Sequence, residues 1–400
     1  MTNIPISLIQ EKYDLVLDRI KNIHIKHFPG FPEPVFLISN TYPGVWLEHV
    51  YDAISWAMFD PAGVDVARAQ VNLFLSNQKE DGQFPCYVID ESNPLEYFRE
   101  SKIGYSQIQE CVSFAALCLD AYTLSQDAEL LQIAYEKCTK WDKWLCENRM
   151  TLKTGLIELF CVYDTGHDES ARLSDVANQC PEQNARNCGP GSHMPLIAPD
   201  MNAVFYGSRI ALAKMAKLLG KTDEADNWQQ NAHDVKEKLI RHCYDTADEF
   251  FYDIDRSGNM RKHCSIHIAN LFQEHLLDGD MAERIYNRYM KNTNEFWTPY
   301  PFPSMSVSDP GFAQTKDGNC WSFYSQGLTA LRAMRWMDYY GKSEDLEHIM
   351  KQWVTAFINS PSMNFSQELH PITGCPSNSS EWYSSSMLLF IHSVRRLGLI

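Results

Sequence analysis

The sequence predicts an all-α protein that folds as an (α/α)6 toroid, a ring of six helical hairpins whose long loops form a central pocket. Apolar residues recur every three or four positions in about twelve segments, which is the period of an amphipathic helix. Strand-like alternation is nearly absent, and six long connections interrupt the helices. Twelve helices joined in pairs give six hairpins, and the long connections would meet at one end of the ring.

Short turns and boundary signals separate the expected helices. Gly220 precedes Lys221-Thr-Asp-Glu and Gly341 precedes Lys-Ser-Glu-Asp, and each pattern indicates a helix end followed by a new cap. The expected helical segments are 6–22, 47–58, 63–78, 106–124, 127–148, 200–219, 222–243, 264–275, 279–291, 320–341, 344–359 and 382–397.

The long connections collect prolines, glycines and aromatic residues, as in Gly82-Gln-Phe-Pro85. Connections of this length are uncommon in compact domains and often carry function. Neither a composition shift nor a low-complexity linker divides the chain, so we expect residues 1–400 to form a single domain. A helical solenoid would show a clearer sequence repeat. The connections are 24–46, 79–105, 150–199, 245–263, 292–319 and 360–381.

Composition narrows the class of ligand. With 400 residues, 44% hydrophobic and 22% charged, the chain can bury a large core. Its net charge of −16 comes without a basic stripe, which argues against nucleic acids and anionic membranes as partners and favours a neutral, hydroxyl-rich ligand. The segment Met1–Asp14 lacks a signal-peptide pattern, and no apolar run approaches about 18 residues. We expect a cytoplasmic monomer or small homo-oligomer.

Metal and cofactor signals are weak. The twelve cysteines are scattered without a Cys-x-x-Cys pair, so neither a disulfide framework nor a zinc ribbon is predicted. Cys180 and Cys188 flank a polar run and could close a loop or bind a metal, although two free thiols are the expectation. His263 and His267 share one helical face, but no third ligand is evident. We expect no metal and no cofactor, and we find no phosphate-binding loop or serine nucleophile motif.

A polar cluster, Tyr163-Asp-Thr-Gly-His-Asp168-Glu-Ser-Ala-Arg172, lies between two helical regions. Asp168 can be held by backbone donors and Arg172, or kept protonated in a dry cleft. A carboxyl group tuned in this way can act as a general acid on a leaving group. The alternative is an exposed acidic loop in which Arg172 is a solvated partner.

Short motifs follow one another in a particular order along nearly the whole chain. They are Trp46 with Phe59-Asp-Pro61 and Asn77 to Pro85, Gly155-Leu with the Asp164 to Arg172 cluster, Asp200-Met-Asn-Ala203, Leu219-Gly220 to Trp228, Phe251-Tyr-Asp253, Pro303-Ser304 with Asp309-Pro310, and Phe365 through Pro371-Ile-Thr-Gly374. Together they resemble the catalytic domain of the glycoside hydrolase group that contains trehalases, processing α-glucosidases and mannosylglycerate hydrolases.

This resemblance implies an inverting glycosidase. The position that matches the family's general acid is Asp168, and a second carboxylate from the loop that ends in Pro-x-Thr-Gly would activate water on the opposite sugar face. Inversion requires roughly 6.5–9.5 Å between the two carboxyl groups. In this chain the position four residues before Pro371 is Gln367, and Glu368 follows it. An amide cannot accept a proton as a carboxylate does.

We therefore expect the loop to shift by one residue and present Glu368, or else the base is lost. Two more positions depart from the family. Glu48 and His49 stand where it commonly has tryptophan and aspartate, and Cys320 to Gly327 replaces a Trp-Arg-Gly-Pro-type loop. The substrate is expected to differ from those of the better-known members.

The predicted function is a glycosidase, inverting, that acts on a small glycoside or glycosylated solute. Asp168 would be the acid, oriented by Arg172, and Glu368 or a water held by Gln367 would stand opposite. Aromatic rings stack on sugar faces and amides bind hydroxyl pairs. The residues expected to bind substrate are Trp46, His49, Gln83, Phe84, Tyr163, Arg172, Asn202, Trp321, Tyr324, Gln326 and Trp382.

Two alternatives stay open. If Gln367 truly replaces the base, Asp168 could serve as a lone acid in a lyase, isomerase or cyclase. A sugar-binding or scaffold protein without catalysis is the second. Sugar epimerases share the toroid and use paired histidines, but that function leaves the Asp168 cluster and the Pro371 loop unexplained.

Overall fold

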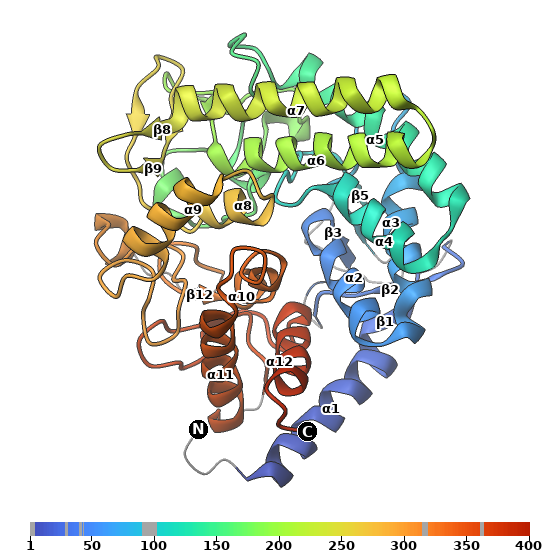
Figure 1. The fold of residues 1–400 in the computed structure, drawn as a ribbon, viewed down its shortest axis with the longest axis vertical. Coiled ribbons are helices and arrows are strands. Elements are labelled where there is room, and N and C mark those ends of the chain that lie inside the picture. Colours follow the sequence, from blue (N-terminus) through green and yellow to red (C-terminus); the bar gives the residue numbers. More distant parts are fainter. Residues whose placement is uncertain are drawn as a thin grey trace.

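The helices follow one another around a ring in the computed structural model (Figure 1). The structure describes residues 5–28, 31–39, 42, 44–89, 102–313, 319–360 and 364–400. Each of the expected helical segments contains an α-helix. The helices are α1 (Ile6–Arg19), α2 (Val50–Phe59), α3 (Val64–Ser76), α4 (Phe114–Ser125), α5 (Ala128–Asn148), α6 (Pro199–Leu218), α7 (Thr222–Cys243), α8 (Ile268–Gln273), α9 (Gly279–Ile285), α10 (Gly327–Arg332), α11 (Ser343–Asn359) and α12 (Ser384–Arg396).

Even-numbered helices form an inner ring. Helix α2 packs against α4, α4 against α6, α6 against α8, and α10 against α12, while α8 meets the 3₁₀ turn Ala333–Arg335 that follows α10. Odd-numbered helices lie outside, as α5 does against α4 and α7 against α6. Helix α12 packs against both α1 and α2, so the first and last helices close the ring (Figure 1). The predicted (α/α)6 toroid is confirmed.

Local sequence sets several helix boundaries. The side chains of Ser113, Asp127 and Asp278 accept hydrogen bonds from backbone N–H groups at the starts of α4, α5 and α9. Gly220 and Gly341 have positive φ angles of 75° and 69° just before α7 and α11, as their turn patterns predict.

Several helices are shorter than predicted, and in α4 and α10 the difference supplies loop residues near the central cavity. Helix α4 begins at Phe114 rather than near 106, and α10 covers only Gly327–Arg332 of the expected 320–341. Periodicity alone does not reveal this, because some loop residues keep the spacing of a helix face, as Ile108, Cys111 and Val112 do before α4.

Short strands tie the long connections together, which the near absence of alternation did not predict. None of those in the described residues exceeds three residues. Strand β12 pairs antiparallel with β13, so that Gln326 lies opposite Glu368. The strands are β1 (Ile25–His27), β2 (Pro34–Phe36), β3 (Gly44–Trp46), β4 (Tyr87–Ile89), β5 (Ile103–Gly104), β6 (Glu158–Leu159), β7 (Leu196–Ile197), β8 (Tyr244–Asp245), β9 (Phe250–Phe251), β10 (Asp253–Ile254), β11 (Met260–Arg261), β12 (Ser325–Gln326) and β13 (Glu368–Leu369).

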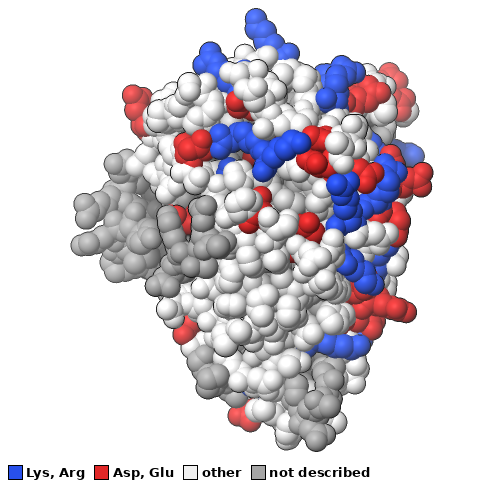
Figure 2. Space-filling view, turned by 90° about the vertical axis from the view of Figure 1, so that its left-hand side faces the viewer, with Lys and Arg blue, Asp and Glu red and all other residues white. Residues whose placement is uncertain are grey.

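Charges of both signs are interspersed on the surface. Figure 2 shows one face, on which Lys and Arg lie beside Asp and Glu in the upper part and along one edge, while the middle carries few charges. Ion pairs such as Arg261 with Asp175 and Arg284 with Glu249 have this character. Among the described helices, none has the length and apolar character that crossing a membrane requires.

Candidate active site

Asp168 lies in the long connection between α5 and α6, two residues after Gly166. Its side chain is only partly exposed, and its Oδ2 accepts a hydrogen bond from Nδ2 of Asn319 at 2.6 Å. Loss of contact with water, together with the nearby Glu48 carboxylate, raises the pKa of Asp168 to about 8. Asp168 is therefore protonated at neutral pH, as a general acid must be.

Asn319 joins Asp168 to the Pro371 loop. Its Oδ1 accepts a hydrogen bond from Nε2 of Gln367 at 2.7 Å, while its Nδ2 donates to Asp168. We call Asp168, Asn319 and Gln367 the amide bridge. Two hydrogen bonds through one amide group place the Asp168 carboxyl and the Gln367 amide within about 8 Å of each other. This upper bound is compatible with the roughly 6.5–9.5 Å that separates the two catalytic carboxyl groups of inverting glycosidases.

Gln367 and Glu368 point to different surroundings, because side chains alternate along a strand. Gln367 is linked to Asp168 through Asn319, and its Oε1 has no hydrogen-bond partner among the described residues. Glu368 is fully buried, and its carboxylate accepts hydrogen bonds from Cys320 N, Gln326 Nε2 and Ser377 Oγ at 2.6–2.8 Å. Burial raises the pKa of Glu368. The amide, rather than the carboxylate, faces Asp168.

A polar cavity lies inside the ring, and its lining includes His167, the residue that precedes Asp168. The His167 ring stacks on Trp321 with centroids 4.3 Å apart, which gives the cavity a flat aromatic wall. Burial lowers the pKa of His167 to about 3, so this ring is neutral at physiological pH. The polar side chains that line the cavity include Glu48, Thr165, His167, Asn270, Gln273, Thr329 and Arg332.

Glu48 and His49 enter the same region from the 3₁₀ turn Leu47–His49 before α2. Burial raises the pKa of Glu48, and the Arg332 guanidinium opposes that rise. Arg332 also donates to the backbone oxygen of Glu48 at 2.6 Å. His49 lies 2.5 Å from the Tyr383 hydroxyl through its Nε2, and burial lowers its pKa well below the usual value. His49 thus lies beside the cavity as a neutral ring, with its Nε2 held by another side chain.

Arg172 does not orient Asp168, contrary to our expectation. The guanidinium donates two hydrogen bonds to Asp200 at 2.8 Å and two to Asp253 at 2.6 Å, and the side chain is fully buried. Two bidentate pairs use every donor nitrogen of the guanidinium. Arg172 therefore ties α6 to β10 and is not available to a substrate.

Gln83 and Phe84 were also expected in the sugar site, and the structure gives both other contacts. Phe84 is buried and packs against Phe114 and Trp141 at 4.9 and 5.7 Å between ring centroids. Gln83 donates to the backbone oxygen of Tyr105 at 3.0 Å. Gln83 thus fixes the backbone at Tyr105, and Phe84 packs in the core.

Asn202 and Trp382 are likewise engaged elsewhere. The Asn202 amide exchanges two hydrogen bonds of 2.9 Å with the backbone of Ile157 and is fully buried. Trp382 lies under the guanidinium of Arg19 from α1, 4.0 Å from the ring centroid, and beside Phe365. Asn202 therefore fixes the backbone at Ile157, and Trp382 packs between Arg19 and Phe365.

The other aromatic residues predicted to bind substrate lie in different parts of the structure. Trp46 ends β3 and contacts the rings of Tyr42 and Tyr87. Tyr163 packs against the cluster of Phe160, Cys161 and Cys180. Tyr324 is partly exposed beside Phe323. Of the aromatic residues predicted to bind substrate, Trp321 is the one that lines the described cavity.

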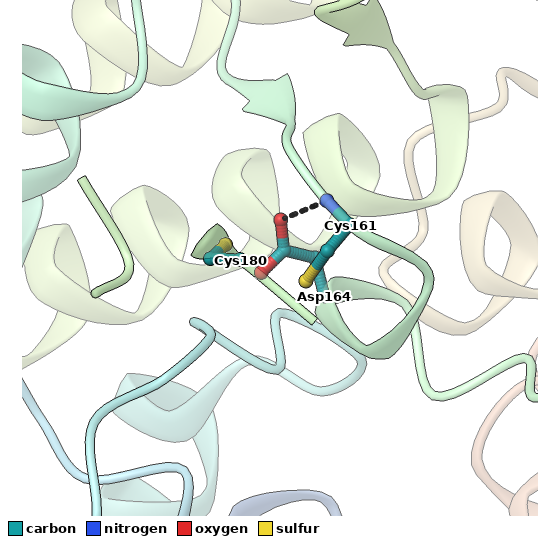
Figure 3. Close-up of side chains that lie close together, drawn as sticks. All are labelled: Cys161, Asp164 and Cys180. Atoms are coloured by element: carbon teal, nitrogen blue, oxygen red, sulfur yellow. Dashed lines mark hydrogen bonds between the residues drawn. The ribbon is translucent and has the colours of Figure 1, made fainter. Parts of the chain in front are cut away.

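Cys161, Asp164 and Cys180, all from the connection between α5 and α6, come together (Figure 3). Their donor atoms lie within 4.8 Å of one another, so we tested whether they fit a metal ion. Asp164 is bound to Arg149 at 2.5 Å, and the same guanidinium donates to Cys180 Sγ at 3.8 Å. A fixed guanidinium at this position opposes a cation, so we assign no metal here. All twelve cysteines are free, as expected.

The histidine pair considered for metal binding is separated by its contacts. His267 is buried, with its Nδ1 2.6 Å from Ser265 Oγ and its Nε2 2.9 Å from the backbone oxygen of Phe251. His263 lies 3.3 Å from Asp309. The two rings serve different local networks.

Comparison with known sequences places this arrangement in a family. The profile of the mannosylglycerate hydrolase MGH1-like glycoside hydrolase domain matches residues 42–386. The chain belongs to this glycoside hydrolase family. An uncharacterized protein of Borreliella burgdorferi is 29% identical over 146 residues, a match that spans 36% of this chain and 30% of that protein.

Solved structures share the fold of this glycoside hydrolase domain. A family 63 mannosylglycerate hydrolase from Thermus thermophilus, in complex with Tris and D-glycerate, has a TM-score of 0.74 at 16% identity, covering 96% of this chain and 99% of that one. The neutral trehalase of Saccharomyces cerevisiae has a TM-score of 0.70 at 14% identity, covering 97% and 82%. Both likenesses support the toroid predicted from the sequence.

Several residues of the glycoside hydrolase site were not predicted from the sequence. Asn319, Arg332, Asn270 and Gln273 line the cavity or complete the amide bridge, yet no motif marks them. Glu48 was noticed only as a departure from the family pattern. Only the structure shows that Asn319 has a left-handed φ of 40°, a conformation that asparagine tolerates better than most residues.

Proposed function

We propose that this protein hydrolyses the O-glycosidic bond of a small glycoside or glycosylated solute with inversion, and that Asp168 is the general acid. The proposal rests mainly on the amide bridge, in which a carboxyl with a raised pKa is linked through Asn319 to the family's base position within about 8 Å, a distance compatible with inversion. Membership of the glycoside hydrolase family supports the reaction class.

In this mechanism Asp168 gives its proton to the glycosidic oxygen as the bond to the anomeric carbon breaks. The sugar ring would lie against the stacked His167 and Trp321 rings, whose π faces favour the developing positive charge. Water attacks the anomeric carbon from the opposite side, held there by the unpartnered Oε1 of Gln367. The attacking water loses its proton, and Gln367 cannot take it.

Glu368 is the carboxylate that we assign to accept this proton. Its raised pKa makes it a stronger base than a solvated glutamate. Ser377, which is only partly exposed, donates to Glu368 Oε2 at 2.8 Å and offers a hydroxyl path from water to the buried carboxylate. Glu368→Gln should therefore lower kcat with little change in KM, while Gln367→Glu should restore a direct base and raise kcat.

The test is an assay of purified protein against α- and β-linked disaccharides and glycosylated small solutes, with mannosylglycerate and trehalose included because structural neighbours carry those names. NMR of the released sugar identifies the anomer. Inverted product that disappears in Asp168→Asn supports the proposal. Retained configuration, or full activity in Asp168→Asn, would refute it.

One observation favours a second function. Since the residue that faces Asp168 is an amide, Asp168 could act as a lone acid in a lyase, isomerase or cyclase that needs no activated water. This second function would be favoured if the folded protein hydrolysed none of the compounds in the panel but converted a sugar derivative in a reaction that consumes no water. Ligand binding without any turnover would instead indicate a sugar-binding protein.

A further inference from the structure

Asn319 lies between Asp168 and Gln367, the two residues that the proposed function places on opposite sides of the substrate. It lies in the connection between α9 and α10 with a left-handed φ of 40°, and the next residue is Cys320, whose N–H donates to Glu368. Its amide donates to Asp168 and accepts from Gln367. Among the described residues, Asn319 is the one whose side chain donates to the Asp168 carboxyl group.

The direction of these two hydrogen bonds determines where a proton can sit. Oδ2 of Asp168 accepts from Asn319 Nδ2, which occupies the lone pair that faces Asn319 and makes Oδ2 the weaker proton acceptor of the two oxygens. The proton of a neutral Asp168 therefore favours Oδ1. A carboxylic acid with one oxygen fixed as an acceptor presents its O–H from the other, which is the geometry needed for transfer to a leaving group.

The same direction fixes the other end of the amide bridge. Asn319 Oδ1 accepts from Gln367 Nε2, and this leaves Oε1 as the free end of the Gln367 amide. A buried carbonyl oxygen without a donor is costly, so it favours a ligand that brings an O–H group, such as water or a sugar hydroxyl. In the reverse orientation the bridge would need the proton on Oδ2, where Asn319 rather than the substrate would hold it.

We infer that Asn319 is a positioning residue that directs the proton of Asp168 to Oδ1 and turns the Gln367 amide so that its Oε1 faces the substrate. This inference rests on the proposed function, because it assigns Asp168 and Gln367 their roles. Asn319 acts through both and does not itself react.

Two substitutions test this role while respecting the left-handed backbone. Asn319→Gly keeps φ accessible and removes the amide, and Asn319→Asp keeps the shape but replaces the donor by a carboxylate. Both remove a hydrogen bond that favours ionised Asp168, and the second adds a like charge. The pKa of Asp168 should therefore rise in the order wild type, Asn319→Gly, Asn319→Asp. The other acidic groups near Asp168 are Glu48, Glu169 and Glu368, and they are unchanged in both variants.

The first measurement needs no substrate. Proteins labelled with ¹³C at the aspartate carboxyl are titrated by NMR, and the Asp168 signal is assigned by its absence in Asp168→Asn. Asn294→Gly and Asn294→Asp, at an exposed turn residue, are the matched controls and should leave the titration unchanged. The same pKa in wild type and both Asn319 variants would overturn the inference, as would the reverse order.

The second measurement is the pH profile of turnover on the active substrate. We expect kcat to fall by about 10- to 100-fold in both Asn319 variants with KM within about threefold, and the alkaline limb to move to higher pH. A purely structural role would change stability without moving that limb. If Asp168→Asn keeps turnover, the proposed function fails. If Asp168→Asn loses turnover while the Asn319 variants keep the wild-type profile, only the role of Asn319 fails.

Discussion

Asp164 and Asp168 stand four residues apart in one polar cluster, and the fold puts them in opposite environments. Asp164 is fully buried, paired with Arg149 at 2.5 Å, and accepts backbone N–H groups of Ile108 and Phe160 at 2.9 and 2.8 Å. Asp168 has one side-chain donor among the described residues, Asn319, and its pKa is raised to about 8. The first carboxyl group is fixed by a guanidinium and backbone donors, and the second is kept protonated.

The difference shows that the number of hydrogen-bond donors around a carboxyl group, more than its burial, distinguishes a structural carboxyl group from one that can transfer a proton. A buried carboxylate that has a guanidinium and several N–H donors binds its partners and is fixed in place. A carboxyl with one donor and a neighbouring acid keeps its proton and can pass it on. Each prediction below changes one side of this comparison.

Asp168→Asn should have the largest effect on function. The amide keeps the shape of the side chain but has no proton to transfer, so we expect kcat to fall by about 10²- to 10⁴-fold. The free energy of unfolding should stay the same or rise slightly, because Asn places no charge in the site. Activity and urea unfolding, measured on the same preparation, check both statements. A large loss of stability would mean that Asp168 is structural.

Asp164→Asn should have the largest effect on stability. It leaves the buried Arg149 without its counter-charge, and breaking a buried ion pair on one side costs about 3–5 kcal/mol. Urea denaturation of this variant measures the loss. Asp175→Asn, which weakens the more exposed pair with Arg261, is the matched control and should cost less than about 1 kcal/mol. Equal losses in the two variants would contradict the contrast.

Much of the fold could be predicted from the sequence because the residues that determine a helix lie close together in the chain. The period of apolar residues located each of the α-helices described here, and turns at Gly220 and Gly341 follow from local backbone preference. The resemblance also located Asp168, since the motif around it is short and continuous. Local signals of this kind can be recognised in a single sequence.

The contacts of the site could not be predicted, because they join distant parts of the chain. Asp168 and Asn319 are 151 residues apart, and Arg172 and Asp253 are 81 apart. The motif in which Arg172 lies gives no information on which carboxylate it will reach. Nor does the sequence indicate which side chains of a loop point inward, which is why Phe84 was placed in the pocket although it packs in the core.

The pH dependence of stability should separate the two carboxyl groups further. The pKa of Asp168 rises from 3.8 to about 8 on folding, so between these values the folded protein keeps a proton that the unfolded chain releases. The free energy of unfolding should thus decrease as the pH rises from about 4 to 8. Because Asp168 is partly exposed, we expect about 2 kcal/mol. Urea unfolding of wild type and Asp168→Asn at pH 5 and 8 checks it: the variant should lack this decrease.

Gly166 separates the two acids, and its substitution should give the smallest effect. Its φ is 69°, and a Cβ would clash with Glu48 Oε2, so Gly166→Ala both strains the backbone and displaces Glu48. We expect a loss of about 1–2 kcal/mol in stability, together with a lower pKa of Asp168, because the Glu48 carboxylate that helps to raise it moves away. Gly258→Ala is the matched control, since φ there is 86° but the space around its Cβ is open. The strain is common to both variants, and only Gly166→Ala should move the alkaline limb of activity, to lower pH. An unmoved limb would mean that Glu48 does not help to keep Asp168 protonated.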